Sequence, residues 1–235
     1  MHFPSASIEN NSLKIEYLTE GALRLVSLKR KGNDNNLLGE ALEKIVPLGE
    51  SGYPILGGQR LWASPEDPGW SYGDEKSIPL DIEASYNSVR IMQQQPEAAG
   101  LRKSITVALE GDLPRLTIQH ELINESQSPV TAAPWALTIL PVGGVILLPL
   151  PKNSSNPGFL PQHNLVFWSY TTMKNLRMQY RKDCILLPST GRAGAAKLGT
   201  YLQEGWCGYY NHGVFFKKLA PPSAPPSAYP DFGCS

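Results

Sequence analysis

Proline and glycine recur along the whole chain, and this distribution limits the fold more than any other feature of the sequence. The chain of 235 residues holds 21 prolines and 21 glycines. Inside a helix a proline costs about 3 kcal/mol and a glycine about 1 kcal/mol relative to alanine, so few long helices fit between them. Short strands joined by many turns tolerate this spacing. The distribution therefore favours an all-β fold and argues against a helical bundle.

Short runs of alternating apolar and polar residues support the same fold class. The clearest is LTIQHEL, residues 116–122, in which one face packs inward and the residues between face the other way. Residues 12–28 alternate on either side of Glu20-Gly21, which indicates an opening hairpin. Further β-like runs are 88–95, 101–111, 113–124 and 135–140. We therefore expect an antiparallel all-β fold.

The length of the chain predicts its domain organisation. All-β domains of about 200 to 250 residues commonly fold as one unit, so we expect residues 1–235 to form a single domain. Residues 35–45 carry apolar residues at a helical spacing, although a glycine interrupts them and a proline follows. Residues 220–228, APPSAPPSA, predict an extended, polyproline-like loop at the surface of that domain.

Charge and cysteine usage exclude several classes of function. Lys and Arg total 21, as do Asp and Glu, so no positive field is present to gather nucleic acid or anionic lipid. Cys184, Cys207 and Cys234 are odd in number and widely spaced, which indicates reduced thiols. The N-terminus does not follow the pattern of a signal peptide, and proline and glycine interrupt the longest apolar stretch. We expect a cytoplasmic protein without cofactor, metal, nucleic-acid or membrane partner.

The segment GGQRLWASPE, residues 57–66, is the densest functional signal. Its glycine pair permits close approach of the backbone, and Arg60 and Glu66 flank Trp62. Sugar rings stack their C–H faces on tryptophan, while their hydroxyls bond to guanidinium, amide and carboxylate groups. Gln59, Arg60 and Trp62 are therefore candidate sugar contacts. The alternative is a turn followed by a core tryptophan, with Arg60 and Glu66 paired at the surface.

Three later segments also combine aromatic with polar or cationic residues: 124–138, 165–177 and 197–218. Each tryptophan in them also suits a core position. They add four candidate sugar contacts: Trp135, Arg177, Lys197 and Lys217. Because several of these residues are cationic, an anionic sugar is the preferred ligand.

The four histidines give no local support for a metal centre or for a Ser/His/Asp arrangement, because none lies next to another. His120 lies within a predicted strand, where a structural role is expected. His163 and His212 lie in predicted loops, where either can touch a ligand.

In their order along the chain these motifs resemble an uncharacterised bacterial domain-of-unknown-function family of the galactose mutarotase-like superfamily. The resemblance runs from about Leu13 to Gly233 and rests on GGQRLWASPE, NESQSPVTAAPWALTIL, LVFWSY, KLG, GW, FFKK and YPDFG. It implies a large antiparallel β-supersandwich whose concave face recognises carbohydrate. Most members of the family use a histidine where this chain has Gln59.

The superfamily's aldose 1-epimerases open and reclose the sugar ring with a glutamate base and a histidine acid. At the position that resembles the acid, this chain reads Ala133-Pro134-Trp135. The base lies beyond the position that matches Tyr229-Pro230-Asp231, and this chain ends at Ser235. The resemblance therefore implies sugar binding without epimerase activity, in a sandwich that lacks its last strands. Such a sandwich leaves an exposed sheet edge through which the chain can form a homo-oligomer.

Three hypotheses follow from the sequence. The first is a sugar-binding domain without turnover. The second is an aldose 1-epimerase-like or other carbohydrate-active enzyme in which Glu66 and Asp231 are the catalytic carboxylates. The third is a structural or assembly scaffold, because a fold does not determine a function. A naturally short protein and a gene fragment both remain open.

Overall fold

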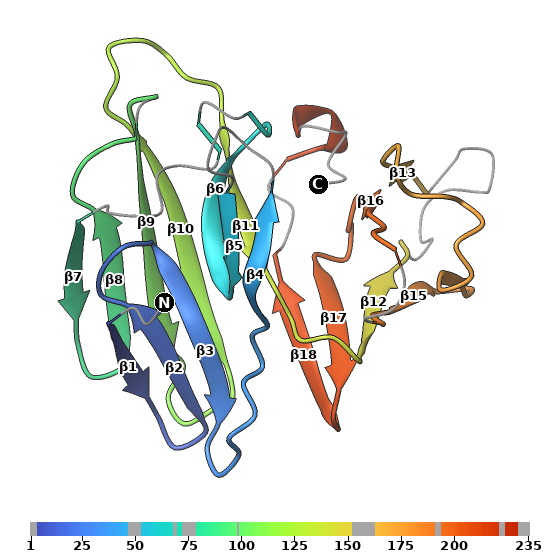
Figure 1. The fold of residues 1–235 in the computed structure, drawn as a ribbon, viewed down its shortest axis with the longest axis horizontal. Helices are drawn as coiled ribbons and strands as arrows, with labels where there is room; N and C mark the ends of the chain where they lie inside the picture. The colour runs from blue at the N-terminus through green and yellow to red at the C-terminus, as the bar shows by residue number, and fades with distance from the viewer. Residues whose placement is uncertain are drawn as a thin grey trace. The chain divides into compact units, whose positions relative to one another are not determined.

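The computed structural model describes residues 4–46, 53–67, 70–71, 79–97, 99–151, 163–190, 194–220 and 224–229. The chain divides into two compact units, Met1–Pro141 and Val142–Ser235, and each is described by itself below. Figure 1 shows that both units are built from strands. The single domain expected over residues 1–235 stays a prediction.

One antiparallel sheet of the first unit has the strand order β1-β2-β3-β6-β11. It contains the predicted opening hairpin, β2 and β3, and Gly21 between them has a φ of 89°, which glycine adopts without steric cost. The strands are β1 (Ser5–Glu9), β2 (Leu13–Leu18), β3 (Arg24–Arg30), β6 (Gln59–Ser64) and β11 (Ala133–Thr138).

A second antiparallel sheet of this unit has the order β10-β9-β8-β7. Its strands are β7 (Leu80–Ala84), β8 (Ser88–Gln93), β9 (Leu101–Leu109) and β10 (Leu116–Asn124). Val89, Ile91, Ile105 and Val107 alternate along β8 and β9 and are fully buried, so the period of two predicted from the sequence places them in the core. The prediction of an antiparallel all-β fold is confirmed.

A two-stranded ribbon of β4 (Glu40–Val46) and β5 (Tyr53–Gly57) lies between β3 and β6 in the sequence. The helical spacing of apolar residues in 35–45, which a glycine interrupts and a proline follows, does not produce a helix, because strand β4 begins at Glu40 and pairs with β5. The helical spacing of a few leucines is a weak preference, and pairing with a neighbouring strand overrides it.

The glycine pair that leads into β6 is required by the close approach of two backbone segments. Gly57 and Gly58 have φ values of 100° and 73°. A Cβ atom on Gly58 would overlap the carbonyl oxygen of Leu25, and the Gly58 amide donates a 2.9 Å hydrogen bond to the carbonyl of Gly39. The pair therefore positions the start of the motif that carries Gln59 and Arg60.

The main sheet of the second unit has the order β14-β15-β12-β17-β18, and β13 pairs with β16. The hairpin of β17 and β18 has a two-residue loop, His212-Gly213, in which both φ values are positive, as a type I′ turn requires. The strands are β12 (Val145–Pro149), β13 (Leu165–Phe167), β14 (Gln179–Tyr180), β15 (Cys184–Pro188), β16 (Leu198–Thr200), β17 (Trp206–Asn211) and β18 (Val214–Leu219).

The segment 220–228 departs from its prediction in part. It was expected to be extended, but the 3-10 helix η1 covers Pro226–Ala228, and the Ala228 amide donates to the carbonyl of Pro225 over 3.0 Å. Proline at positions 225 and 226 fixes φ near −65°, a value that suits a tight 3-10 turn as well as an extended chain. Across the described ranges, no helix has the length and apolarity to cross a membrane.

Candidate functional site

The pairing of β6 with β11 brings three predicted sugar contacts into one cluster. Trp62 lies opposite Trp135, with ring centroids 5.4 Å apart and planes at 72°. The guanidinium of Arg60 lies 4.3 Å from the centroid of the Trp62 ring, within the range of a cation–π interaction. Arg60 and Trp62 are 5% and 6% exposed, whereas Trp135 is half-buried. We call these three residues the tryptophan cluster.

The arginine of this cluster is oriented by the backbone of β5. Arg60 Nη1 donates a 2.7 Å hydrogen bond to the carbonyl of Ile55. Arg24 Nη1 donates to the same carbonyl over 3.1 Å and also to the carbonyl of Gly57. Arg24 is buried and was not a candidate at the level of sequence. The signal that could have found it is a charged residue between Leu23 and Leu25 in an apolar strand.

Gln59 lies on the opposite face of β6 from Arg60 and Trp62, because neighbouring residues of a strand point to opposite faces. Its amide nitrogen lies 3.1 Å from Nε2 of His120 on β10, and the hydroxyl of Thr138 donates to its amide oxygen. Gln59 is 3% exposed. These contacts give His120 a structural hydrogen bond, as expected, and they separate Gln59 from the tryptophan cluster.

The two predicted catalytic carboxylates are not brought together within the described part of the chain. Glu66 is exposed and follows the end of β6 by two residues. Asp231 lies outside the described residues, so its position relative to Glu66 is not part of this structure. The carboxylate pair therefore stays a prediction.

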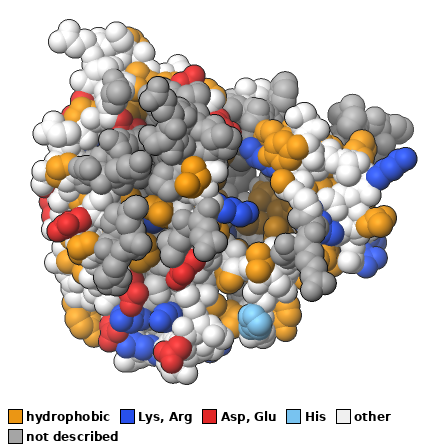
Figure 2. Space-filling model, in the orientation of Figure 1, with side chains coloured by type: hydrophobic (Ala, Val, Ile, Leu, Met, Phe, Trp, Pro, Cys, Tyr) orange, Lys and Arg blue, Asp and Glu red, His pale blue; other side chains and the backbone are white. Residues whose placement is uncertain are grey.

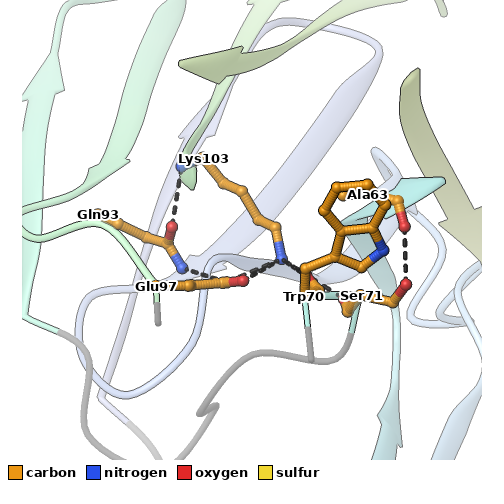
Figure 3. A network of polar contacts seen from close by, with 6 residues as sticks. All are labelled: Ala63, Trp70, Ser71, Gln93, Glu97 and Lys103. Atoms are coloured by element: carbon orange, nitrogen blue, oxygen red, sulfur yellow. Dashed lines mark hydrogen bonds and ion pairs between the residues drawn. The ribbon is translucent and has the colours of Figure 1, made fainter. Parts of the chain in front are cut away.

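A buried ion pair, missed at the level of sequence, fixes the segment after β6 (Figure 3). Lys103 Nζ on β9 lies 2.8 Å from both carboxylate oxygens of Glu97, and the two side chains are only 3% and 6% exposed. The same ammonium group lies 3.4 Å from the carbonyl of Ser71. The Ser71 hydroxyl donates over 2.8 Å to the carbonyl of Ala63 on β6. Lys103 thus ties β9 to the segment that bears Glu66.

In the second unit, β13 and β16 place a lysine on a tryptophan. Lys197 Nζ lies 3.7 Å from the centroid of the Trp168 ring, and the Lys197 amide donates a 2.7 Å hydrogen bond to Thr171 Oγ1. Arg177 is half-buried and donates over 2.8 Å to the carbonyl of Gly194. The predicted contacts Arg177 and Lys197 therefore both belong to the second unit.

The β17–β18 hairpin holds the last predicted contact, Lys217. Its ammonium group lies 4.7 Å from the centroid of the Trp206 ring, and the Phe215 ring meets Trp206 edge to face at 6.4 Å. Lys217 is exposed. Trp206 and Phe215 were recognised as part of an aromatic segment but were not among the predicted contacts.

The pKa values of Glu121, Cys207 and Lys218 are shifted, each with a clear physical cause. A 2.6 Å hydrogen bond from Ser104 lowers the pKa of Glu121, and Arg90 lowers it further. On the second unit, Lys218 lies opposite Cys207 across the hairpin. Burial lowers the pKa of Lys218 and raises the pKa of the Cys207 thiol, because both charged forms lose solvation.

Within the described ranges, no group of three or more His, Cys, Asp or Glu side chains is arranged to hold a metal ion. Cys184 and Cys207 are free thiols, and Cys234 lies outside the described residues. Comparison of the chain with protein-family models, with curated proteins and with solved structures gave no match.

Proposed function

We propose that the chain binds a carbohydrate through the tryptophan cluster of its first unit. The observation that carries this proposal is the direct contact of Trp62 with Trp135, together with Arg60 stacked on Trp62. Two segments far apart in the sequence thus join an aromatic surface to a cation. Aromatic faces are the groups on which the C–H side of a sugar ring stacks.

The burial of the cluster assigns different roles to its members. Trp135 is half-buried and provides the surface on which a sugar ring can stack. Trp62 and Arg60 are almost fully buried, so they support Trp135 from within and hold its indole in one orientation. Because a fixed side chain loses little conformational entropy on binding, this arrangement favours affinity.

The proposal retains the fold and the absence of turnover that the resemblance implies. In it, the all-β chain is a galactose mutarotase-like supersandwich, and Trp135 occupies the strand that resembles the acid-bearing strand of an epimerase. Indole donates a hydrogen bond but does not act as an acid at neutral pH. The free thiols of Cys184 and Cys207 suit a reducing compartment, which supports a cytoplasmic location.

A thermal-shift screen against neutral monosaccharides, sugar acids and sugar phosphates tests the proposal. A ligand that binds only the native state raises Tm, and the hits are then titrated by calorimetry. We expect Trp135→Ala to weaken binding about 10-fold, the loss of one aromatic stacking contact of about 1.4 kcal/mol, and Trp135→Phe to retain most of it. Trp168→Ala, a tryptophan of the second unit, is the matched control.

Polarimetry on a freshly dissolved pure anomer separates binding from catalysis. We expect the rate of anomer interconversion to equal that of buffer alone. A faster rate that Glu66→Gln abolishes would replace the proposal by an epimerase that uses Glu66. Binding of every sugar unchanged in Trp135→Ala would refute the role of the tryptophan cluster.

A further inference from the structure

One face of the β17–β18 hairpin is apolar, aromatic and exposed. Residues directly opposite each other in an antiparallel pair share a face. The register pairs Trp206 with Leu219, Gly208 with Lys217, and Tyr210 with Phe215. We call this face the hairpin platform: Trp206, Gly208, Tyr210, Phe215, Lys217 and Leu219.

The exposure of the platform exceeds what large apolar side chains usually show. Tyr210, Phe215 and Leu219 are 53%, 47% and 59% exposed. Figure 2 shows one face of the molecule, on which hydrophobic side chains reach the surface beside Lys and Arg side chains over the second unit. A contiguous exposed apolar patch commonly marks a binding surface.

A glycine in the middle of the platform gives the aromatic rings their arrangement. A Cβ atom on Gly208 would lie 2.7 Å from Cε2 of Phe215, so the end of the Phe215 ring lies over the Gly208 backbone. From there the ring meets Trp206 edge to face. Glycine within a strand often marks a place where another group approaches the backbone closely, and here that group is the aromatic ring of Phe215.

The charge of the platform selects among ligands. Lys217 is its single charged residue, and its ammonium group lies against the Trp206 ring. Within β12, β17 and β18 the charged side chains are Lys217 and Lys218, both cationic, and no carboxylate occurs in these strands. An anionic group therefore meets the positive charge of Lys217 beside the rings, and these three strands contribute no carboxylate to oppose it.

We propose that the hairpin platform binds an acidic saccharide, a sugar whose ring stacks on the exposed Phe215 while its carboxylate pairs with Lys217, which lies on the Trp206 ring. For its ligand class the inference rests on the proposed function, but it assigns a second site. A protein partner with a carboxylate would meet the same charge. The exposed Phe215 ring beside a single cation favours a flat ring that carries one anionic group over an interdigitating protein surface.

Calorimetric titration with tetragalacturonate tests the inference, with its fully methyl-esterified form and with acetate as probes that lack the charge or the ring. We expect the acid to bind more tightly than the ester, and acetate not to bind. Phe215→Ala should weaken binding of the acid about 10-fold. Lys217→Gln should remove the preference for acid over ester. Because Phe215→Ala removes apolar surface, Phe215→Leu provides a second variant that keeps a large apolar side chain without a ring.

Two controls separate this inference from the proposed function. Tyr180→Ala removes an aromatic ring of similar exposure, 48%, from β14 and should leave binding unchanged. If Trp135→Ala abolishes saccharide binding and the platform variants do not alter it, the inference fails and the proposed function stands. If only the platform variants alter binding, the inference stands and the tryptophan cluster is not the site. Self-association that Phe215→Ala abolishes, measured by sedimentation velocity, would also overturn the inference.

Discussion

Removing one partner of the buried ion pair between Lys103 and Glu97 should destabilise the first unit strongly. Both side chains are almost fully buried, and the ammonium group contacts both carboxylate oxygens at 2.8 Å. Lys103→Met leaves the carboxylate of Glu97 buried without its counterion. Among the described contacts it then keeps a hydrogen bond of 3.0 Å from the side-chain amide of Gln93. Removing one partner of a buried pair costs about 3–5 kcal/mol. At about 2–4 °C per kcal/mol, Tm should fall by about 6–20 °C.

Urea unfolding of Lys103→Met, Glu97→Gln and the double variant measures this effect. We expect the double variant to lose about 2–3 kcal/mol less than the sum of the two single variants, because it leaves no buried charge without its counterion. The matched control is Lys31→Met, which breaks an ion pair with Glu9 whose side chains are 38% and 51% exposed. An exposed pair contributes little. Equal losses in Lys103→Met and Lys31→Met would refute the reasoning.

Two further predictions concern the first unit. Ser104→Ala removes the hydrogen bond that lowers the pKa of Glu121. The stability that this bond adds is present above the unfolded-state pKa and is lost as pH falls through the folded-state pKa, so wild type and variant should converge in acid. Urea unfolding across a pH series checks this, and a gap that is constant in pH would contradict it. Gly58→Ala should lose more stability than Gly32→Ala, because both glycines have positive φ but only Gly58 faces the carbonyl of Leu25. Thermal unfolding compares the two, and equal losses would count against this steric argument.

The strands were predictable where their residues alternate, because a half-buried strand leaves its period of two in the sequence. Residues 116–122 and the hairpin of 12–28 follow that rule: the first lie in β10, and the second contain β2 and the start of β3. Residues 40–46 were not predictable in this way. The spacing of Leu38, Leu42 and Ile45 resembles that of a helix, and the partner strand β5, which decides the outcome, contributes nothing to the local pattern.

The site was predictable in its residue types but not in its grouping. Reading GGQRLW as a strand already places Gln59 on the opposite face from Arg60 and Trp62. The contact of Trp62 with Trp135 depends on the register of β6 with β11, which local sequence does not encode. Arg24 and Lys103 were missed for the same reason, since the carbonyls and carboxylate that bond to them come from distant segments.

The two-residue turn His212-Gly213 fixes the register of β17 with β18. This register determines which side chains of β18 share the hairpin platform with Trp206 and Tyr210. Adding one residue to β18 beyond the turn would rotate every following side chain to the other side of the sheet. Val214 and Phe216 would then take the places of Phe215 and Lys217. Chains that descend from this one should therefore keep the hairpin platform only when the length of β18 after the turn changes by an even number of residues. A gap of odd length at this position in an aligned descendant would indicate that the platform is lost.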